Sequence, residues 1–313
     1  MNDDHADLGE QTVTDDVIAG VDLHGSTAVV TGASTGLGLE TARALASAHA
    51  HVVLAVRDAT KGEASVATIC DAVPGASVEF VLLDLASLSS VRACAADVLQ
   101  RVSAIDILVN NAGVMYTPFE RTADGFELQF GTNHLGHFLF TNLLVPAVLA
   151  AAPARIVNLS SGGHRSSDII WDDPNYESRT YDKFEAYGQS KTANILFSVE
   201  LDRRLSARGV RTYAVHPGMI MTELGRHMTR DDMKELQARA KAAPSGGLPS
   251  FKSIPAGAAT AVWAATASAL ADTGGVYLAD CQLAEASAYA LDPGGAARLW
   301  AISEELVGQR FDW

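Results

Sequence analysis

Short apolar stretches alternate with longer amphipathic or alanine-rich stretches from residue 21 to the end of the chain. The short stretches are rich in Val, Ile and Leu along nearly their whole length, which is typical of strands that are buried on both faces. Seven strands are predicted, at residues 27–31, 51–56, 77–82, 105–109, 155–159, 210–215 and 275–278. The longer stretches predict helices at residues 37–48, 61–73, 88–101, 126–149, 184–205, 255–270 and 296–307.

This alternation is typical of βαβ units, in which a helix connects two parallel strands. We therefore expect an α/β fold with a doubly wound, seven-stranded parallel sheet that is flanked by helices. No repeat, low-complexity tract or linker interrupts the pattern, so residues 21–313 are predicted to form one domain. Residues 162–182 and 224–253 are polar or rich in Gly and Pro, and long irregular loops of this kind are usually functional.

Composition and charge exclude several classes of partner. The chain has 313 residues, 48% hydrophobic and 19% charged, so it can bury a large core. A total of 23 Lys and Arg against 37 Asp and Glu gives a net charge of −14, which argues against nucleic acids and anionic membranes as partners. The 3 cysteines lack disulfide or zinc spacing, so we expect no metal site and a reducing, cytoplasmic location.

Residues 1–20 contain several Asp and Glu and no Lys or Arg, the reverse of a secretory signal. We expect an acidic, flexible extension that is exposed to solvent. Residues 128–154 and 253–271 are uncharged and long enough to span a membrane, but the first holds many polar residues and the second is mostly alanine. Both are predicted to be buried core helices of a protein that does not contact a membrane.

A glycine-rich turn follows the first predicted strand and opens the first predicted helix. Its glycines, Gly32, Gly36 and Gly38, permit a tight turn, and the helix N-terminus offers N–H groups to a pyrophosphate. The turn therefore predicts an anionic dinucleotide on a Rossmann fold, although the spacing is GxxxGxG and not GxGxxG. Since no Lys or Arg precedes Arg43, backbone amides are expected to neutralise most of the ligand's charge.

The end of the second predicted strand bears on the choice of cofactor. There Val56 is followed by Arg57 and Asp58. A guanidinium group suits a 2′-phosphate, which favours NADP(H). Asp58 can reach a ribose hydroxyl group instead, so NAD(H) stays possible.

Tyr187 and Lys191 are spaced i and i+4 and share one face of the helix predicted at residues 184–205. A free tyrosine with a pKa near 10 is only about one part in a thousand ionised at pH 7. A cation about 4 Å away can lower such a pKa by roughly three units. The pair is therefore a candidate for acid/base catalysis.

With these motifs in this order, the chain resembles the short-chain dehydrogenase/reductase family, in the group typified by retinol dehydrogenases and the WW-domain-containing oxidoreductase. The matching segments are residues 31–38, 84–85, 110–113, 133–138, 158–161, 187–191 and 216–218, and residues 277–281 and 299–300 resemble the C-terminal end of retinol dehydrogenases. The resemblance implies that Tyr187 is the general acid/base and that Lys191 lowers its pKa and binds the nicotinamide ribose. It also implies that Ser161, rather than Ser160, polarises the substrate oxygen and that Asn133 holds a water of the proton relay.

The same resemblance implies a set of cofactor contacts along the carboxyl ends of the strands. They are Gly32, Ser34, Thr35, Gly36, Leu37, Gly38, Arg57, Asp84, Leu85, Asn110, Ala112, Gly113, Tyr187, Lys191, Pro217, Gly218, Ile220 and Thr222. The neighbouring histidines His134 and His137 share a helix face, but no carboxylate or cysteine cluster joins them. We therefore expect core and capping roles for both, and not metal binding.

The implied activity is NAD(P)(H)-dependent hydride transfer between a lipophilic secondary alcohol and a ketone, of steroid, terpenoid, retinoid or aryl type. Gly163, Trp171, Met219 and Leu224 are expected to line the substrate pocket. The alternative is a dinucleotide-binding regulator or scaffold without turnover. A homodimer and a monomer both remain possible.

Overall fold

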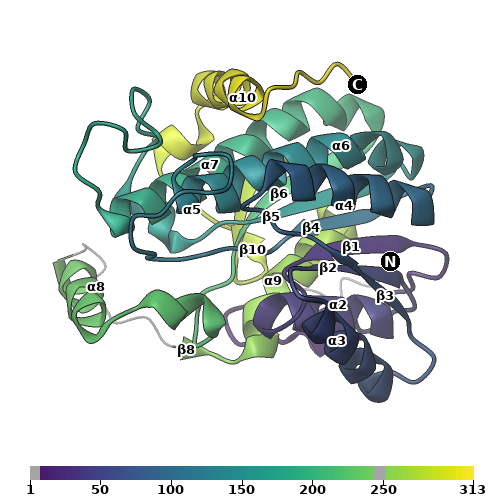
Figure 1. The fold of residues 1–313 in the computed structure, drawn as a ribbon. Helices are drawn as coiled ribbons and strands as arrows, with labels where there is room; N and C mark the ends of the chain where they lie inside the picture. Colours follow the sequence, from purple (N-terminus) through teal and green to yellow (C-terminus); the bar gives the residue numbers. More distant parts are fainter. Residues whose placement is uncertain (1–7, 243–250) are drawn as a thin grey trace.

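The structure is a computed structural model that describes residues 8–242 and 251–313. An eight-stranded sheet lies at its centre between two layers of helices (Figure 1). Its strands are β1 (Thr27–Thr31), β2 (His51–Val56), β3 (Ser77–Leu82), β4 (Ile107–Asn110), β5 (Ala154–Leu159), β6 (Val210–His216), β9 (Val276–Ala279) and β10 (Gln282–Leu283). A separate pair consists of β7 (Met219–Ile220) and β8 (Phe251–Lys252). All seven predicted strands are present, and three have the predicted bounds.

The order of the main sheet is β10-β9-β6-β5-β4-β1-β2-β3. Strand β1 pairs in parallel with both β2 and β4, so the chain winds outward from β1 in two directions. In such doubly wound sheets ligands bind outside the carboxyl ends of the strands at this switch point. The turn after β1 therefore begins where a ligand site is expected.

The seven predicted strands are parallel to one another, and the sheet has an eighth strand that the sequence did not predict, β10, which pairs antiparallel with β9 at one edge. The connecting residues Asp280 and Cys281 have positive φ angles of 54° and 55° and reverse the chain in a tight turn. Strand β10 is too short for an alternating pattern to reveal it. Strand β4 also starts later than predicted, since the Ile105 amide donates to the Ala147 carbonyl of a covering helix.

Each face of the sheet is covered by its own helices (Figure 1). On one face lie α2 (Gly36–Ser47), α3 (Ala59–Ala72) and α9 (Ile254–Thr266). On the other lie α4 (Leu88–Arg101), α6 (Gly136–Ala150) and α7 (Lys183–Leu205), with α10 (Pro293–Val307) packed on α7.

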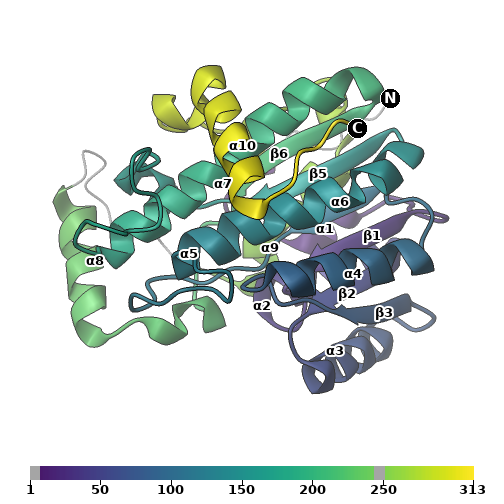
Figure 2. The same cartoon turned by 45° about the horizontal axis from the view of Figure 1, so that its top comes forward.

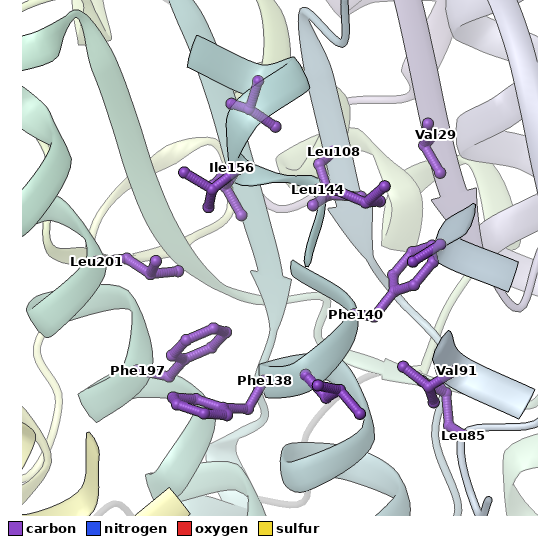
Figure 3. Packing of buried hydrophobic residues seen from close by; sticks show 14 of the residues in the cluster. Val29, Leu85, Val91, Leu108, Phe138, Phe140, Leu144, Ile156, Phe197 and Leu201 are labelled. Atoms are coloured by element: carbon purple, nitrogen blue, oxygen red, sulfur yellow. The ribbon is translucent and has the colours of Figure 1, made fainter. Parts of the chain in front are cut away.

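The strands are apolar throughout because successive side chains enter different cores. Val29 packs into the cluster under α4, α6 and α7, whereas Val30 packs into the cluster under α2 and α9. Figure 3 shows the first cluster, in which Leu108 and Ile156 of the sheet face Leu144 of α6. This double burial explains why apolar runs, rather than alternation, marked the strands.

The predicted solvent-exposed extension at residues 1–20 is wrong over part of its length. Helix α1 (Thr14–Ile18) packs on α2 and α9, and Val17 is fully buried in their core. Arg43 on α2 donates to Asp15, and Thr14 donates to Glu40 on α2, so two hydrogen bonds hold α1 in place. Residues 1–7 lie outside the described residues.

Two further predicted segments differ from the structure. The helix predicted at residues 126–149 is divided into α5 (Leu128–Phe130), a π-helical turn η1 (Gly131–Leu135) and α6. The irregular segment predicted at residues 224–253 contains α8 (Arg230–Ala242), which projects from the body of the molecule (Figure 1). Most residues of α8 are polar, so the sequence showed no clear apolar stripe there. Residues 243–250 lie outside the described part.

The chain after α10 folds back across α6 (Figure 2). Trp300 of α10 packs edge-on against Phe138 of α6 with 5.0 Å between the ring centres, and Phe311 contacts the same ring. Arg92 of α4 donates to the Val307 carbonyl over 3.0 Å. Among the described helices, none is both long and apolar enough to cross a membrane.

Candidate active site

The glycine-rich turn lies where β1 ends and α2 begins. Gly32 and Gly36 have positive φ angles of 66° and 57°, which favour glycine. A Cβ atom on Gly32 would lie 2.8 Å from the Ala112 Cα atom, so only glycine fits between β1 and β4. Within residues 8–242 and 251–313, no side chain caps the first turn of α2, which leaves its amides available to a ligand.

A cleft of about 420 Å³ opens in front of this turn. It brings together most of the predicted cofactor contacts: Gly32, Ser34, Thr35, Gly36, Leu37, Gly38, Arg57, Asp84, Leu85, Ala112, Gly113 and Thr222, with Leu224 from the predicted substrate pocket. Asp58, the alternative ribose contact, also lines it, and its other lining residues, which the sequence did not single out, are Ala55, Lys61, Leu83, Asn111, Val114, Thr132, Glu223 and Arg226.

Three cations at the cleft correct one expectation. Backbone amides were expected to neutralise most of an anionic ligand, but Arg57, Lys61 and Arg226 line the cleft as well. Arg57, which follows β2, was predicted, whereas Lys61 on α3 and Arg226 in the 3-10 turn η4 (Glu223–His227) were not. No local signal links Lys61 and Arg226 to the glycine turn.

Asp58 is the N-cap of α3. Its carboxylate accepts a hydrogen bond of 2.8 Å from the Lys61 amide, so α3 begins two residues before its predicted start. Arg57, directly before it, lines the cleft and is exposed. Asp58 thus caps α3, whereas Arg57 has no such structural role.

Six predicted cofactor residues do not line the cleft. Tyr187 and Lys191 belong to the catalytic group described below, and the other four are Asn110, Pro217, Gly218 and Ile220. Asn110 is buried, and its amide donates to Thr141 and Asn158 over 2.7 and 2.8 Å, so it braces β4 against α6 and β5. Its neighbour Asn111 lines the cleft instead. The segment from Pro217 to Ile220 runs behind the cleft, where Gly218 packs on the stem of Lys252 and Ile220 packs on α9.

The four predicted catalytic residues meet at one end of this cleft, where Gly113 lines it. A Cβ atom on Gly113 would lie 3.1 Å from the Asn133 Oδ1 atom and 3.7 Å from the Lys191 Nζ atom. Asn133 and Lys191 are almost fully buried, and Ser161 faces Tyr187. The site therefore joins η1, the end of β5 and the first turns of α7.

Ser160 and Ser161 point in different directions. The Ser160 hydroxyl group donates to the Lys191 carbonyl over 2.8 Å and is buried, whereas the Ser161 hydroxyl group accepts from the Gly163 amide over 3.0 Å. Strand alternation thus leaves Ser161 on the side of Tyr187. The ring nitrogens of the nearby His164 bond to the Ser161 carbonyl and the Ser287 amide, and not to the Ser161 hydroxyl group.

Burial governs the protonation of the site. Desolvation raises the pKa of Tyr187 to about 12, while its hydrogen bond with Ser161 acts in the opposite direction. Desolvation also lowers the pKa of Lys191 to about 8. The expected lowering of the Tyr187 pKa by Lys191 is not found here, since the Lys191 ammonium group donates to the Leu159 carbonyl over 3.0 Å and lies 5.7 Å from the centre of the phenol ring.

Asn133 holds the chain segment that lies in front of it. Its side-chain oxygen accepts from the Val114 amide over 2.8 Å, and its side-chain nitrogen donates to the Val114 carbonyl and to Ser190. All these groups are buried. The π-helical turn η1 directs Asn133 toward the site, and such turns are frequent at functional sites.

An apolar wall lies beside Tyr187. It is made of Tyr116, Phe184 and Tyr187, with Met115, Met228 and Leu236 packed against them. Gly163 belongs to the same corner, because a Cβ atom there would lie 2.8 Å from the Tyr187 ring. Tyr116 comes shortly after the motif at residues 110–113, but nothing in the sequence indicates that its ring lies beside Tyr187.

Tyr116 is held in an unusual backbone conformation. Its φ angle is 53°, a left-handed value that costs a bulky residue about 1–3 kcal/mol. Its amide donates over 2.8 Å to the side-chain oxygen of the buried Gln129. The Gln129 side-chain nitrogen in turn donates to the Tyr181 hydroxyl group and the Lys183 carbonyl. This network fixes the position of the ring beside Tyr187.

Trp171 does not line this wall, contrary to the prediction. Its ring packs on α10, where the Arg298 guanidinium group lies 4.4 Å from the ring centre. Met219 lies on β7, where it pairs with Phe251. The loop at residues 162–182 thus uses its tryptophan to attach itself to the C-terminal helix.

Within the described part of the chain, no group of three or more His, Cys, Asp or Glu side chains is placed to hold a metal ion. His134 and His137 are buried and bond to different partners, Ser303 and Thr31. Desolvation lowers their pKa values to about 3 and about 4, so both rings are neutral at pH 7.

Fold and site define a dinucleotide-dependent oxidoreductase, and the comparisons assign the family. The family model described as short chain dehydrogenase matches residues 26–233. Human retinol dehydrogenase 13 is 44% identical over 290 residues, which cover 91% of this chain and 86% of that protein. The chain therefore belongs to the short-chain dehydrogenase family and is an alcohol-type oxidoreductase that binds a nicotinamide dinucleotide.

Solved structures agree with this assignment. An uncharacterised protein from Mycobacterium paratuberculosis is similar with a TM-score of 0.75 and 38% identity, covering 95% of this chain and 98% of that one. Gluconate 5-dehydrogenase from Burkholderia cenocepacia, solved with NADP and tartrate, has a TM-score of 0.63 and 25% identity, and the match covers 82% of this chain and 94% of that one.

Proposed function

We propose that the protein is an NADP(H)-preferring enzyme that interconverts a lipophilic alcohol, foremost a secondary one, and its carbonyl product. The observation that carries the proposal is the contact between the Ser161 and Tyr187 hydroxyl groups, with buried Lys191 behind them and an apolar wall beside them. This arrangement lies at the end of a cleft that suits a dinucleotide.

The residues of the cleft fit the cofactor. Gly32 and Gly36 leave room for the close approach of a pyrophosphate, and the uncapped start of α2 supplies N–H groups. Arg57 and Lys61 would hold a 2′-phosphate, and Arg226 would add a charge near the pyrophosphate. Asp58 is engaged at the start of α3, which disfavours its use for a free ribose 2′-hydroxyl group.

When bound, the nicotinamide supplies or accepts the hydride. In the direction of carbonyl reduction, Ser161 donates a hydrogen bond to the carbonyl oxygen, on which negative charge develops. Tyr187 is a neutral phenol at pH 7, because burial raises its pKa to about 12, and it gives its proton to the same oxygen. Lys191 provides a positive charge near the phenolate that remains, and Asn133 fixes the backbone of the turn in front of the site.

The apolar wall supports a lipophilic substrate. Met115, Tyr116, Phe184 and Met228 present aromatic and flexible apolar surface beside the Tyr187 hydroxyl group. The relatives named retinol dehydrogenase add retinoids to the steroid, terpenoid and aryl candidates.

The experiment is a measurement of nicotinamide absorbance at about 340 nm with NADP⁺ or NAD⁺ and a panel of retinoid, steroid, terpenoid and aryl alcohols. We expect turnover with one class, and faster turnover with NADP⁺. Tyr187→Phe is expected to lower kcat by about 10²–10⁴-fold and leave cofactor binding unchanged, because only the proton donor is removed. Tyr213→Phe is the matched control, since this buried tyrosine bonds to Leu270 away from the site. Undiminished turnover by Tyr187→Phe would refute the assigned role.

A further inference from the structure

His137 stands behind the site at a junction of two hydrogen-bonded systems. It is buried on α6, one turn after Asn133. Its Nδ1 atom lies 3.0 Å from the Asn133 carbonyl oxygen, and its Nε2 atom lies 2.9 Å from the Thr31 hydroxyl oxygen. Because a carbonyl group can only accept, Nδ1 carries the proton, and the neutral ring accepts a hydrogen bond from Thr31 at Nε2.

This acceptor orients the Thr31 hydroxyl group. With its proton directed at His137, the Thr31 oxygen accepts from the Asn111 and Ala112 amides over 2.9 and 3.0 Å. The other acceptor near the hydroxyl group, the Val109 carbonyl, lies farther away at 3.5 Å. The imidazole therefore determines which way the lone pairs of Thr31 point.

The turn that Thr31 holds also forms part of the cofactor cleft. Residues 111–114 all line the cleft. Thr31 holds the first two residues of this turn by their amides, and Asn133 holds the last by its amide and carbonyl groups. His137 bonds to both Thr31 and the Asn133 backbone, so it closes a ring of hydrogen bonds around the turn.

We propose that His137 is a positioning residue, which holds the wall of the dinucleotide cleft and the π-helical turn bearing Asn133 in one fixed arrangement. Loss of the imidazole frees the Thr31 hydroxyl group to turn toward Val109 and weakens its grip on the amides of Asn111 and Ala112. The cofactor then meets a less ordered wall, and its affinity falls. The inference rests on the proposed placement of the cofactor in this cleft.

A neighbouring histidine supplies a matched control. His134 is equally buried and lies in the π-helical turn that also carries Asn133. Its Nε2 atom donates to Ser303 over 2.8 Å, because the Ser303 hydroxyl group itself donates to the Leu299 carbonyl. This bond points to α10, away from the cleft. Ser303→Ala thus removes one buried histidine hydrogen bond without touching the ring around the turn.

The test measures the dissociation constant of NADP⁺ by isothermal titration calorimetry and the thermal unfolding of the cofactor-free protein. His137→Leu and Thr31→Val are each expected to bind NADP⁺ about tenfold more weakly. The double variant is expected to bind no more weakly than either single variant, because the two residues act through one bond. Ser303→Ala is expected to lower the unfolding temperature and leave the dissociation constant within about twofold.

Two conservative variants separate positioning from packing. His137→Gln keeps an acceptor for Thr31 and is expected to bind NADP⁺ within about threefold of the wild type, whereas His137→Asn reaches only the Asn133 carbonyl and is expected to bind about tenfold more weakly. The Gln and Asn variants also test the positioning role of His137 if His137→Leu does not fold. In kinetics, we expect His137→Asn to lower kcat and leave KM for the alcohol unchanged.

Unchanged NADP⁺ affinity in the Thr31 and His137 variants would overturn the inference. A double variant whose loss of affinity is the product of the two single losses would also overturn it, as would a Ser303→Ala variant that binds NADP⁺ as weakly as the His137 variants. A wild-type protein that binds no dinucleotide would refute the proposed function and this inference together. A wild type that binds normally beside unaffected His137 variants would refute this inference alone.

Discussion

Adjacent residues of this site have different tasks because the backbone turns their side chains to different surroundings. Ser160 bonds to the Lys191 carbonyl while Ser161 faces Tyr187, and Asn110 braces the sheet while Asn111 lines the cleft. In each pair the chemistry of the two residues is the same or similar. Only the direction of the side chain decides which of them can reach a ligand.

Arg57 and Asp58 both line the cleft, but the Asp58 carboxylate accepts a hydrogen bond from the Lys61 amide at the start of α3. Arg57→Ala is expected to raise the dissociation constant of NADP⁺ by about 10- to 100-fold, because a charge-assisted contact to phosphate is lost. The constant for NAD⁺ is expected to change less than about threefold. Titration calorimetry with both nucleotides measures this difference.

Arg208→Ala serves as the control for lost positive charge. Arg208 precedes β6 at the amino ends of the strands, opposite the cleft. Equal weakening of NADP⁺ and NAD⁺ binding by Arg57→Ala would show that Arg57 does not read the 2′-phosphate.

At the scale of elements, the C-terminal helix stabilises the layer that carries the site. Trp300 of α10 contacts Phe138 of α6 and Phe197 of α7, and Arg204 of α7 covers its ring at 4.1 Å from the centre. Ser303 reaches His134 in η1. Helix α10 thus packs on the elements that carry Asn133, Tyr187 and Lys191.

Trp300→Ala is therefore expected to lower the free energy of unfolding by about 3–5 kcal/mol, since it leaves a large cavity among aromatic rings. Denaturant unfolding measures the change. Leu283→Ala, on the exposed strand β10, is expected to change the same quantity by less than about 0.5 kcal/mol. A loss below about 1 kcal/mol for Trp300→Ala would show that α10 is not required for the stability of this layer.

At the scale of the molecule, buried histidines couple folding to pH. Desolvation lowers the pKa of His134 to about 3 and those of His137 and His216 to about 4, from an ordinary value of 6.5. The unfolded chain binds more protons than the folded chain between these values. Their contribution to stability is therefore complete above pH 6.5 and is lost as the pH falls toward 4. Burial raises the pKa of Glu127, which opposes part of this loss.

We expect the unfolding temperature of the cofactor-free protein to fall between pH 6.5 and pH 4.5, as measured by circular dichroism. His216→Asn removes one titrating group outside the core of the sheet and is expected to make this dependence shallower, whatever its effect at pH 7. A flat profile in the wild type over this range would contradict the argument.

The covering of α6 and α7 by α10 also bears on assembly. The sequence left a homodimer and a monomer open. In the structure α10 and the chain after it lie over α6 and α7, which largely covers these two helices against association with a second copy (Figure 2). We therefore expect a monomer of 32.9 kDa in light scattering. A stable dimer would show that another surface mediates association.

The sequence by itself determined the doubly wound sheet, because strands that are buried on both faces are apolar along their whole length and alternate with longer amphipathic helices. It also determined which local motifs are candidates for cofactor binding and catalysis, since the glycine turn and the spacing of Tyr187 and Lys191 depend only on neighbouring residues. The tertiary structure alone decided which side chains share a space. Lys61, Arg226 and Tyr116 reach the site, and Asn110 and Trp171 leave it, through contacts between segments far apart in the chain, which no local pattern encodes.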